Sequence, residues 1–403
     1  MVKTLDVYFN EKVIGQLTQD KHGDVSFAYS HLWLNDPQAI AISCSLPLQA
    51  ESFKKKQCHA FFEGILPEDY QRKKIAKILS ISDNNDFSML EKIGGECAGA
   101  LTFISSQEKL HTEKYAYQEL THEELATILR ELPNKPLLAG KQGVRLSLAG
   151  VQDKLAIYVQ DNKTFIPLNN APSSHILKPA HGQYDDIIFN EFFCLKLAKK
   201  VGLSVANAEI KKIEDINYLL VERYDRVEVD QKLIRLHQED FCQALGVSSK
   251  KKYQNEEGPS LKQIFNLIRS NATVPVVELE KLLETIIFNF FIGNCDAHGK
   301  NFSLLYQDKI LIAPLYDLIC TLYYKDLDTR MAMKVGGEYK IEKISMKNFV
   351  KLSEEIGFSK VEVKKRVLQF RDKIIASLPS IEINYPAQEA IVEIIKQRCL
   401  TFG

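Results

Sequence analysis

Three side chains in the second half of the chain have the types and spacing that phosphoryl transfer needs. Asp296 and Asn301 stand five positions apart within residues 294–302, and Asp317 follows sixteen residues after Asn301. A carboxylate can orient an attacking hydroxyl and accept its proton, whereas an amide oxygen and a second carboxylate are hard ligands for Mg²⁺ on ATP. The spacing therefore predicts a general base at Asp296 and metal ligands at Asn301 and Asp317.

Each of these residues alone also fits a simpler role. An Asp and an Asn five positions apart arise by chance in many proteins, and an Asp after a strand often caps a turn or a helix. His298 fits a structural, hydrogen-bonding residue of the loop. Cys295, Asp296 and His298 also suggest a nucleophile or a metal site, although no partner ligand or base stands at a usable spacing. The phosphoryl-transfer interpretation therefore depends on residues upstream.

The upstream residues supply the remaining parts of such a site. Lys178 ends a short apolar stretch and suits the α- and β-phosphates of ATP, and Glu191 follows thirteen residues later in an expected helix, where it could pair with Lys178. The strand expected over 218–222 could offer backbone groups to adenine. Protein kinases have these parts in the same order: a lysine, a glutamate on a helix, a strand, Asp-x-x-x-x-Asn and a further Asp.

The usual phosphate-binding glycine motifs are missing from the sequence. Neither Gly-x-Gly-x-x-Gly nor Gly-x-x-x-x-Gly-Lys-Ser/Thr occurs, and residues 145–154, Arg-Leu-Ser-Leu-Ala-Gly-Val-Gln-Asp-Lys, stand in their place. Small residues and Gly150 would let backbone N–H groups approach phosphates, and Lys154 adds positive charge.

The elements expected to position these groups form a strand-rich part followed by a mostly helical part, which favours a ligand site between two lobes. Hydrophobic periodicity predicts strands over 5–9, 13–17, 25–29, 100–104, 155–159, 208–213 and 218–222, with short strands over 302–306 and 309–313. It predicts helices over 70–79, 86–93, 121–132, 187–201, 260–269 and 278–292, followed by three C-terminal segments. Residues 105–117 are polar and predict a linker.

The composition is that of a cytosolic globular protein. Of 403 residues, 45% are hydrophobic, and 52 Lys and Arg balance 52 Asp and Glu, so no overall charge favours nucleic-acid binding by the chain itself. No stretch approaches the ~20 apolar residues of a membrane-spanning helix. The eight cysteines form no Cys-x-x-Cys pair, which predicts reduced, mostly buried thiols rather than disulfides or structural zinc.

Six motifs in this order resemble the HipA family, the serine/threonine kinase toxins of bacterial toxin–antitoxin systems. They run from about residue 145 to 317, and the flanking regions are compatible with the family too. The motifs are SLAGVQDK (147–154), HILKP (175–179), ERYD (222–225), RLHQEDFC (235–242), NCDAHGKNFS (294–303) and LYD (315–317).

The resemblance implies an α+β, two-lobed, protein-kinase-like fold with an additional N-terminal subdomain. The expected divisions are a mixed α/β subdomain over 1–110, a kinase N-lobe-like region with the phosphate loop over 111–228, and a largely helical C-lobe over 229–403. Cys295, where a small polar residue is usual, and His237 depart from the commonest family pattern. Neither departure removes a proposed catalytic group, so they put the substrate in doubt more than the reaction.

By motif position, the resemblance implies Asp296 as the catalytic base, Asn301 and Asp317 as ligands of Mg²⁺, and Ser147 as the site of autophosphorylation, which the family links to inactivation. The residues expected to contact ATP are Ser147, Ala149, Gly150, Gln152, Lys154, Lys178, Glu222, Tyr224, His298 and Lys300.

The activity implied is that of a type II toxin which phosphorylates a translation component, with an aminoacyl-tRNA synthetase as the expected substrate. A HipB-like helix-turn-helix antitoxin is the expected partner, so DNA would be contacted only indirectly and no membrane is involved. Two alternatives remain open. One is a catalytically weak nucleotide-binding partner within an antitoxin and repressor complex, and the other is a small-molecule kinase.

Overall fold

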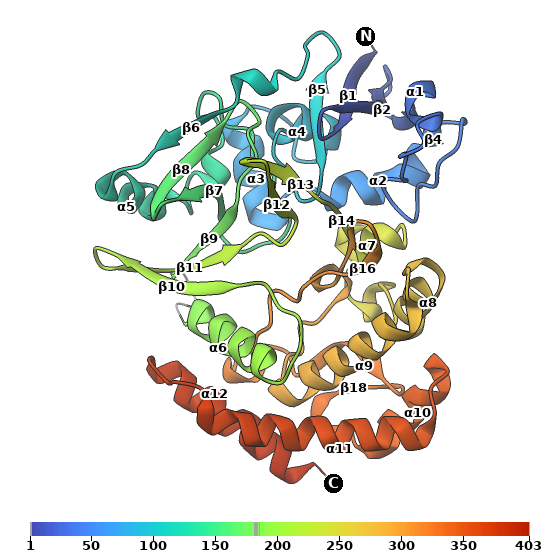
Figure 1. Cartoon of the computed structure of the whole chain (residues 1–403), viewed down its shortest axis with the longest axis vertical. Helices are drawn as coiled ribbons and strands as arrows, with labels where there is room; N and C mark the ends of the chain where they lie inside the picture. The colour runs from blue at the N-terminus through green and yellow to red at the C-terminus, as the bar shows by residue number, and fades with distance from the viewer. Residues whose placement is uncertain (1, 181–183, 185, 403) are drawn as a thin grey trace. The chain divides into compact units, whose positions relative to one another are not determined.

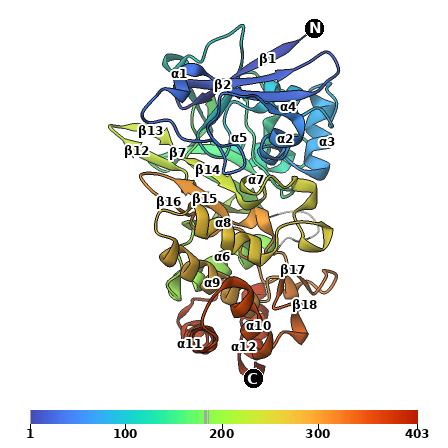
Figure 2. The ribbon, with the colours of Figure 1, turned by 90° about the vertical axis from the view of Figure 1, so that its right-hand side faces the viewer.

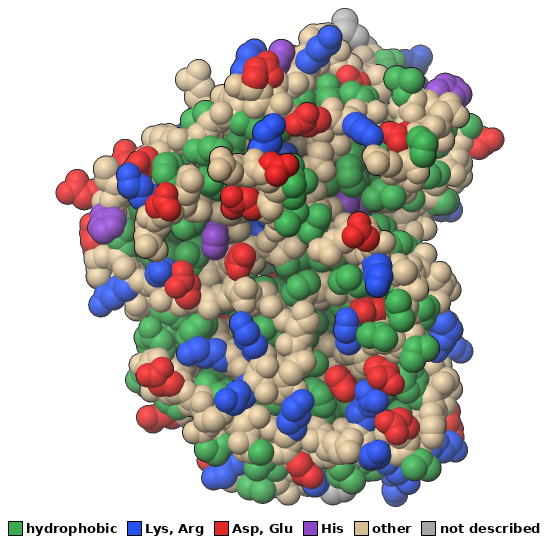
Figure 3. Space-filling model, viewed as in Figure 1, with side chains coloured by type: hydrophobic (Ala, Val, Ile, Leu, Met, Phe, Trp, Pro, Cys, Tyr) green, Lys and Arg blue, Asp and Glu red, His purple; other side chains and the backbone are tan. Residues whose placement is uncertain are grey.

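The computed structural model describes residues 2–180, 184 and 186–402, and it divides into two compact units. The first unit consists of residues 1–179, 211–249 and 305–307, and the second of residues 180–210, 250–304 and 308–403. Both helices and strands are abundant, which confirms the α+β class (Figure 1). Figure 3 shows Lys and Arg side chains intermingled with Asp and Glu across one face of the molecule, as the balanced net charge leads one to expect.

The first unit begins with a five-stranded antiparallel sheet in the order β4-β3-β2-β1-β5. Alternating apolar residues put one face of this sheet into the core, where α2 packs against β3 and α4 against β5 (Figures 1 and 2). The strands are β1 (Lys3–Phe9), β2 (Lys12–Gln19), β3 (Val25–Tyr29), β4 (Phe53–Lys54) and β5 (Leu101–Ser105). The helices are α1 (His31–Leu34), α2 (Lys55–Gly64), α3 (Asp69–Ile78) and α4 (Asp86–Ile93).

A second sheet, most of whose residues belong to this unit, includes the strand β7 that follows the predicted phosphate loop; its strand order is β10-β11-β9-β7-β8-β6. Helix α5 (His122–Glu131) opens with a capping box, because Thr121 Oγ1 accepts the N–H of Glu124 and the Glu124 carboxylate accepts the N–H of Thr121. The strands are β6 (Ala116–Glu119), β7 (Leu155–Gln160), β8 (Lys163–Leu168), β9 (His175–Pro179), β10 (Ala208–Ile213) and β11 (Ile216–Glu222). The unit continues with β12 (Arg226–Val229), β13 (Lys232–Arg235), β14 (His237–Asp240) and α7 (Phe241–Ala244).

The expected linker over 105–117 is wrong at its C-terminal end. Ala116 and Tyr117 begin β6, which forms the edge of the second sheet and pairs antiparallel with β8. The strand is short and polar, so its existence depends on a partner about fifty residues away and leaves little local signal. The hairpin of β12 and β13 was not predicted either, because its buried ends carry Arg226 and Arg235 rather than apolar residues.

The second unit is mainly helical. Helix α9 is apolar on nearly all sides because α8, α11 and α12 pack around it (Figure 1). The helices are α6 (Ile187–Lys200), α8 (Leu261–Asn271), α9 (Pro275–Ile292), α10 (Met346–Ile356), α11 (Lys360–Ser377) and α12 (Pro386–Thr401). The strands are β16 (Ile310–Ile312), β17 (Arg330–Val335) and β18 (Glu338–Lys340), whereas β15 (Ser303–Tyr306) begins in this unit and its last two residues belong to the first.

The predicted free cysteines are confirmed. All eight thiols are unpaired; seven of them are buried and Cys44 is half-buried. Within the described residues, none of the helices combines the length and the apolar character that crossing a bilayer requires.

Candidate active site

The segment with the predicted base begins where α9 ends. Gly293 closes the helix in the left-handed conformation, with φ of 74°, and its N–H donates to the carbonyl of Phe290. The next residues form a loop in which the N–H of Cys295 donates to Thr321 Oγ1 at 2.8 Å. Asp296 lies exposed on this loop, whereas His298 and Lys300 are buried.

A series of hydrogen bonds joins the body of α9 to the backbone of Asp296. Asn289 Nδ2 donates to the carbonyl of Thr285, and Asn294 Nδ2 donates to Asn289 Oδ1 at 2.8 Å. Asn294 Oδ1 in turn accepts the N–H of Asp296 at 3.1 Å. Sequence reasoning missed this arrangement, although two asparagines within an apolar run are a signal for it, because a buried amide needs polar partners.

The two predicted metal ligands meet in one place. Asn301 and Asp317 line the same small pocket of the second unit, together with Thr285, Asn289, Asn294, Ala297, Phe302, Leu315, Tyr316 and Leu318. Asn301 Oδ1 is buried and accepts no hydrogen bond from the described part of the chain. A buried oxygen without a donor is costly, and a bound cation would satisfy it. The pair therefore fits a metal site.

Asp317 is positioned by its neighbours in the second unit. Its φ of 51° is uncommon for a residue with a side chain, and such backbone conformations concentrate at functional sites. The preceding Tyr316 donates its phenol to the carbonyl of Lys300 at 2.8 Å, and the N–H of Leu315 donates to the carbonyl of Ser204 at 2.9 Å. The first bond connects the Asp317 segment to the loop that carries Asn301, and the second connects it to the chain that follows α6.

Metal ligation here would involve few protein groups. Among residues 2–180, 184 and 186–402, no three His, Cys, Asp or Glu side chains gather as a metal cluster. Mg²⁺ is commonly held by one or two protein oxygens together with waters and substrate phosphates. Asn301 and Asp317 match that smaller donor set.

In the first unit, the predicted phosphate-loop residues form one continuous loop before β7. Gly150 has φ of 100°, and a Cβ there would come within 2.8 Å of Lys154 Nζ, which itself donates to the carbonyl of Ala149 at 2.6 Å. Gln152 Nε2 is buried and finds no acceptor in the described residues. An unused donor and an ammonium group beside a glycine fit the binding of a phosphate oxygen.

Lys178 lies close to this loop. Strands β7 and β9 are antiparallel, and Leu155 of β7 pairs with Leu177 of β9. Lys154, just before Leu155, and Lys178, just after Leu177, therefore lie at the same end of the two strands. Both lysines are buried, and the cost of burying an ammonium group implies that each serves a polar partner. The structure thus brings these two predicted cations together.

The other predicted residues are distributed over both units. Glu222, at the end of β11, is exposed, and Tyr224, two residues later, donates its phenol to Gln238 Oε1. Glu191 is buried on α6 of the second unit. Ser147 is wholly buried, where its hydroxyl donates to the carbonyl of Ile65 at 2.9 Å.

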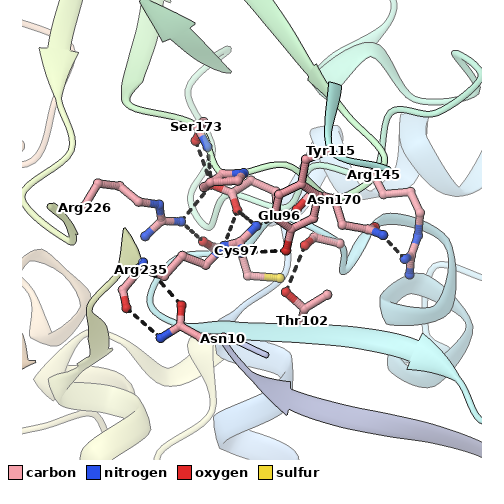
Figure 4. Close-up of polar contacts among 12 residues, drawn as sticks. Asn10, Glu96, Cys97, Thr102, Tyr115, Arg145, Asn170, Ser173, Arg226 and Arg235 are labelled. Carbon is pink, nitrogen blue, oxygen red and sulfur yellow. Dashed lines mark hydrogen bonds and ion pairs between the residues drawn. The ribbon is translucent and has the colours of Figure 1, made fainter. Parts of the chain in front are cut away.

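A buried ionic cluster, which sequence reasoning missed, holds the start of the predicted phosphate loop (Figure 4). The Glu96 carboxylate pairs with Arg226, Arg235 and Arg223 at 2.7, 2.7 and 3.3 Å. The carbonyl of Glu96 accepts the N–H of Ser147 at 2.9 Å. Burial by itself disfavours the carboxylate, but the three guanidinium groups outweigh it and hold the pKa of Glu96 at about 2.

The glycine at the end of α9 gives a first testable prediction. Gly293 and Gly23 both have a positive φ, of 74° and 88°, which strains any residue with a side chain. A Cβ at Gly293 would also lie 2.8 Å from Leu322 Cδ1, whereas a Cβ at Gly23 would meet nothing within 4 Å. We expect Gly23→Ala to cost about 1–2 kcal/mol of stability and Gly293→Ala roughly 2–4 kcal/mol, since overpacking adds to the backbone strain. Urea unfolding followed by far-ultraviolet circular dichroism checks this difference. Equal costs would show that Leu322 moves aside freely.

Two family models match the chain. The model described as HipA N-terminal domain covers residues 5–104, and the model described as HipA-like C-terminal domain covers residues 146–378. Y4mE of Sinorhizobium fredii is 41% identical over 377 residues, which span 92% of this chain and 90% of that protein. The serine/threonine-protein kinase toxin HipA of Shewanella oneidensis is 28% identical over 402 residues, spanning 94% and 91% of the two chains.

A solved structure matches the chain almost throughout. The Shewanella oneidensis toxin–antitoxin complex of HipA, HipB and operator DNA contains a chain that superposes with a TM-score of 0.85 at 26% identity. The match covers 99% of this chain and 97% of that one. The expected fold class is therefore confirmed.

Proposed function

Because this chain belongs to the HipA family of kinase toxins, we propose that it transfers the γ-phosphate of ATP to a serine or threonine hydroxyl of a protein, as the toxin of a type II toxin–antitoxin system. The observation that carries the proposal is the pocket shared by Asn301 and Asp317, where the buried Asn301 oxygen has no donor among the described residues. An exposed carboxylate, that of Asp296, lies five positions earlier in the sequence. The proposed functional divisions are 1–110, 111–228 and 229–403.

Each group has a defined task in this reaction. Asp296 orients the acceptor hydroxyl and takes its proton, while Asn301 and Asp317 would hold Mg²⁺. The metal ion, when bound, neutralises charge on the phosphates. Lys154, Lys178, Gln152 and the backbone of Ala149 and Gly150 would hold ATP through its phosphates, and Ser147 is proposed to lie among the ATP contacts.

The remaining ATP contacts are assigned to both units by motif. Glu222 and Tyr224 are proposed beside adenine, and His298 and Lys300 beside the nucleotide in the catalytic segment. The buried positions of His298 and Lys300 support a role inside a site rather than on a solvated surface.

Ser147 is proposed as the autophosphorylation site. Its hydroxyl and N–H are both engaged with backbone groups, and the side chain is wholly buried, so the loop must leave this conformation before Ser147 can accept a phosphoryl group. A phosphate there adds about 1.5–2 negative charges where ATP phosphates should bind, which would lower ATP affinity.

The proposed partners follow from the relative's complex. That HipA was solved with HipB and operator DNA, and we propose a HipB-like helix-turn-helix antitoxin for this chain, with DNA contacted through the antitoxin. The intermingled surface charges and the zero net charge agree with an indirect contact. The proposed substrate is an aminoacyl-tRNA synthetase and the proposed location is the cytoplasm.

A labelling experiment tests the proposal. The purified chain is incubated with γ-³²P-ATP, Mg²⁺ and a panel of aminoacyl-tRNA synthetases, and labelled peptides are mapped. We expect label on serine or threonine of a synthetase and on Ser147. Thermal stabilisation by ATP without transfer under any Mg²⁺ condition would instead favour the catalytically weak nucleotide-binding partner, and transfer to small molecules alone would favour a small-molecule kinase.

A further inference from the structure

Tyr253, which no sequence motif singled out, makes direct contact with the proposed base. Its phenol Oη donates a hydrogen bond to Asp296 Oδ1 at 2.6 Å, and both residues belong to the second unit. We infer that Tyr253 is a positioning residue which holds the Asp296 carboxylate in its working orientation, an inference that rests on the proposed kinase activity.

The contact occupies one carboxylate oxygen and leaves the other for the substrate. Asp296 is exposed, and its Oδ2 accepts no hydrogen bond from the described part of the chain. A general base must lie within about 2.6–3.2 Å of the hydroxyl from which it takes a proton. With Oδ1 held by the phenol, Oδ2 faces a defined direction, so an acceptor hydroxyl meets an already ordered base.

The ring of Tyr253 is fixed from the catalytic segment itself. It packs edge-to-face on His298, with ring centroids 5.1 Å apart and an interplanar angle of 85°. The neighbouring backbone follows the same segment, because the carbonyl of Lys252 accepts the N–H of Gly299 at 3.5 Å. These contacts fix the Tyr253 phenol relative to the loop that carries Asp296.

The chain around Tyr253 is a tight turn. The carbonyl of Tyr253 accepts the N–H groups of Glu256 and Gly258, each at 2.9 Å. A Cβ at Gly258 would lie 2.3 Å from the carbonyl oxygen of Lys251 and 2.5 Å from that of Tyr253, so only glycine fits this close approach.

A second attachment lies one residue further along, where Gln254 Oε1 accepts the N–H of Lys334 at 2.7 Å. A segment anchored at both neighbours of Tyr253 favours a fixed support for Asp296 over a side chain that swings in and out. The competing role, a phenol that occupies the acceptor's place and must be displaced, is an outcome of the test below.

The test compares Tyr253→Phe with Tyr339→Phe. Phenylalanine keeps the ring on His298 and removes only the hydroxyl, and Tyr339 is a matched control in the same unit because its phenol makes no hydrogen bond within the described residues. Transfer of ³²P from ATP to dephosphorylated casein gives kcat and KM for ATP. Thermal unfolding verifies that each variant is folded.

We expect Tyr253→Phe to lower kcat by roughly 10- to 100-fold, the range of a hydrogen bond to a charged group, with KM for ATP within about twofold of the wild type. Tyr339→Phe should match the wild type. An unchanged kcat in Tyr253→Phe overturns the inference, and a raised kcat identifies the phenol as a block on the acceptor position instead. If the wild type transfers no more phosphate than Asp296→Ala, the proposed function fails, which is a different result from either of these.

Discussion

Asp296→Asn is expected to lower the rate of phosphoryl transfer by about 10²–10⁴-fold, the usual contribution of a general base. Asparagine keeps the size of the side chain and an oxygen for the phenol of Tyr253, but it cannot take the proton of the acceptor hydroxyl. The measurement is single-turnover transfer from γ-³²P-ATP to protein acceptor and to the chain itself.

The stability of this variant should not change, because Asp296 is exposed and its backbone is held by Asn294 through the N–H rather than the carboxylate. Asp308→Asn, an exposed carboxylate between β15 and β16, is the matched control and should transfer phosphate at the wild-type rate. Equal rates for Asp296→Asn and wild type would remove Asp296 from the mechanism while leaving the fold assignment intact.

Glu96→Gln is expected to destabilise the first unit by roughly 3–5 kcal/mol, the cost of removing one partner from a buried ion pair. The amide would leave Arg223, Arg226 and Arg235 buried with Asp225 as the remaining carboxylate of the cluster. Urea unfolding reports this directly, because Trp33 is the only tryptophan of the chain and lies buried in the same unit.

The pH dependence of the wild type provides a second readout of the same cluster. The pKa of Glu96 is held at about 2 in the folded state, below the ordinary glutamate value of 4.5. A lowered carboxyl pKa stabilises the folded state above pH 4.5, and this contribution is lost as the pH falls toward 2. Glu96→Gln should therefore lose less stability over that range than the wild type does.

Glu11→Gln, at the exposed turn between β1 and β2, is the control for loss of a carboxylate and should unfold like the wild type. If Glu96→Gln is as stable as this control, the cluster tolerates an arginine without a carboxylate partner. The charge of Glu96 would then not be needed to stabilise the backbone beside Ser147.

Local sequence patterns were sufficient to predict many helices and strands and to name the candidate site residues. The predicted helix over 187–201 corresponds to α6, the one over 278–292 lies within α9, and the strand over 218–222 lies within β11, since each has a strong apolar period of its own. Asn301 and Asp317 were named from spacing alone, and the structure brings them into one pocket. The loop over 147–154 was likewise recognisable as a continuous motif.

The contacts that support these groups were decided by tertiary structure. Tyr253 reaches Asp296 across 43 positions, and Arg235 reaches Glu96 across 139. Hydrophobic periodicity and motif spacing describe residues that are near one another in the sequence. Neither can predict a contact between two polar residues that meet only after folding.

The sequence by itself determined the order and identity of the proposed reacting groups, because those are properties of short segments. Only the tertiary structure decided which side chains hold them, because a buried charge or an ordered carboxylate depends on partners brought from distant segments. Glu96 is a lone polar residue in the sequence, and it becomes a stable anion only when three arginines surround it away from water.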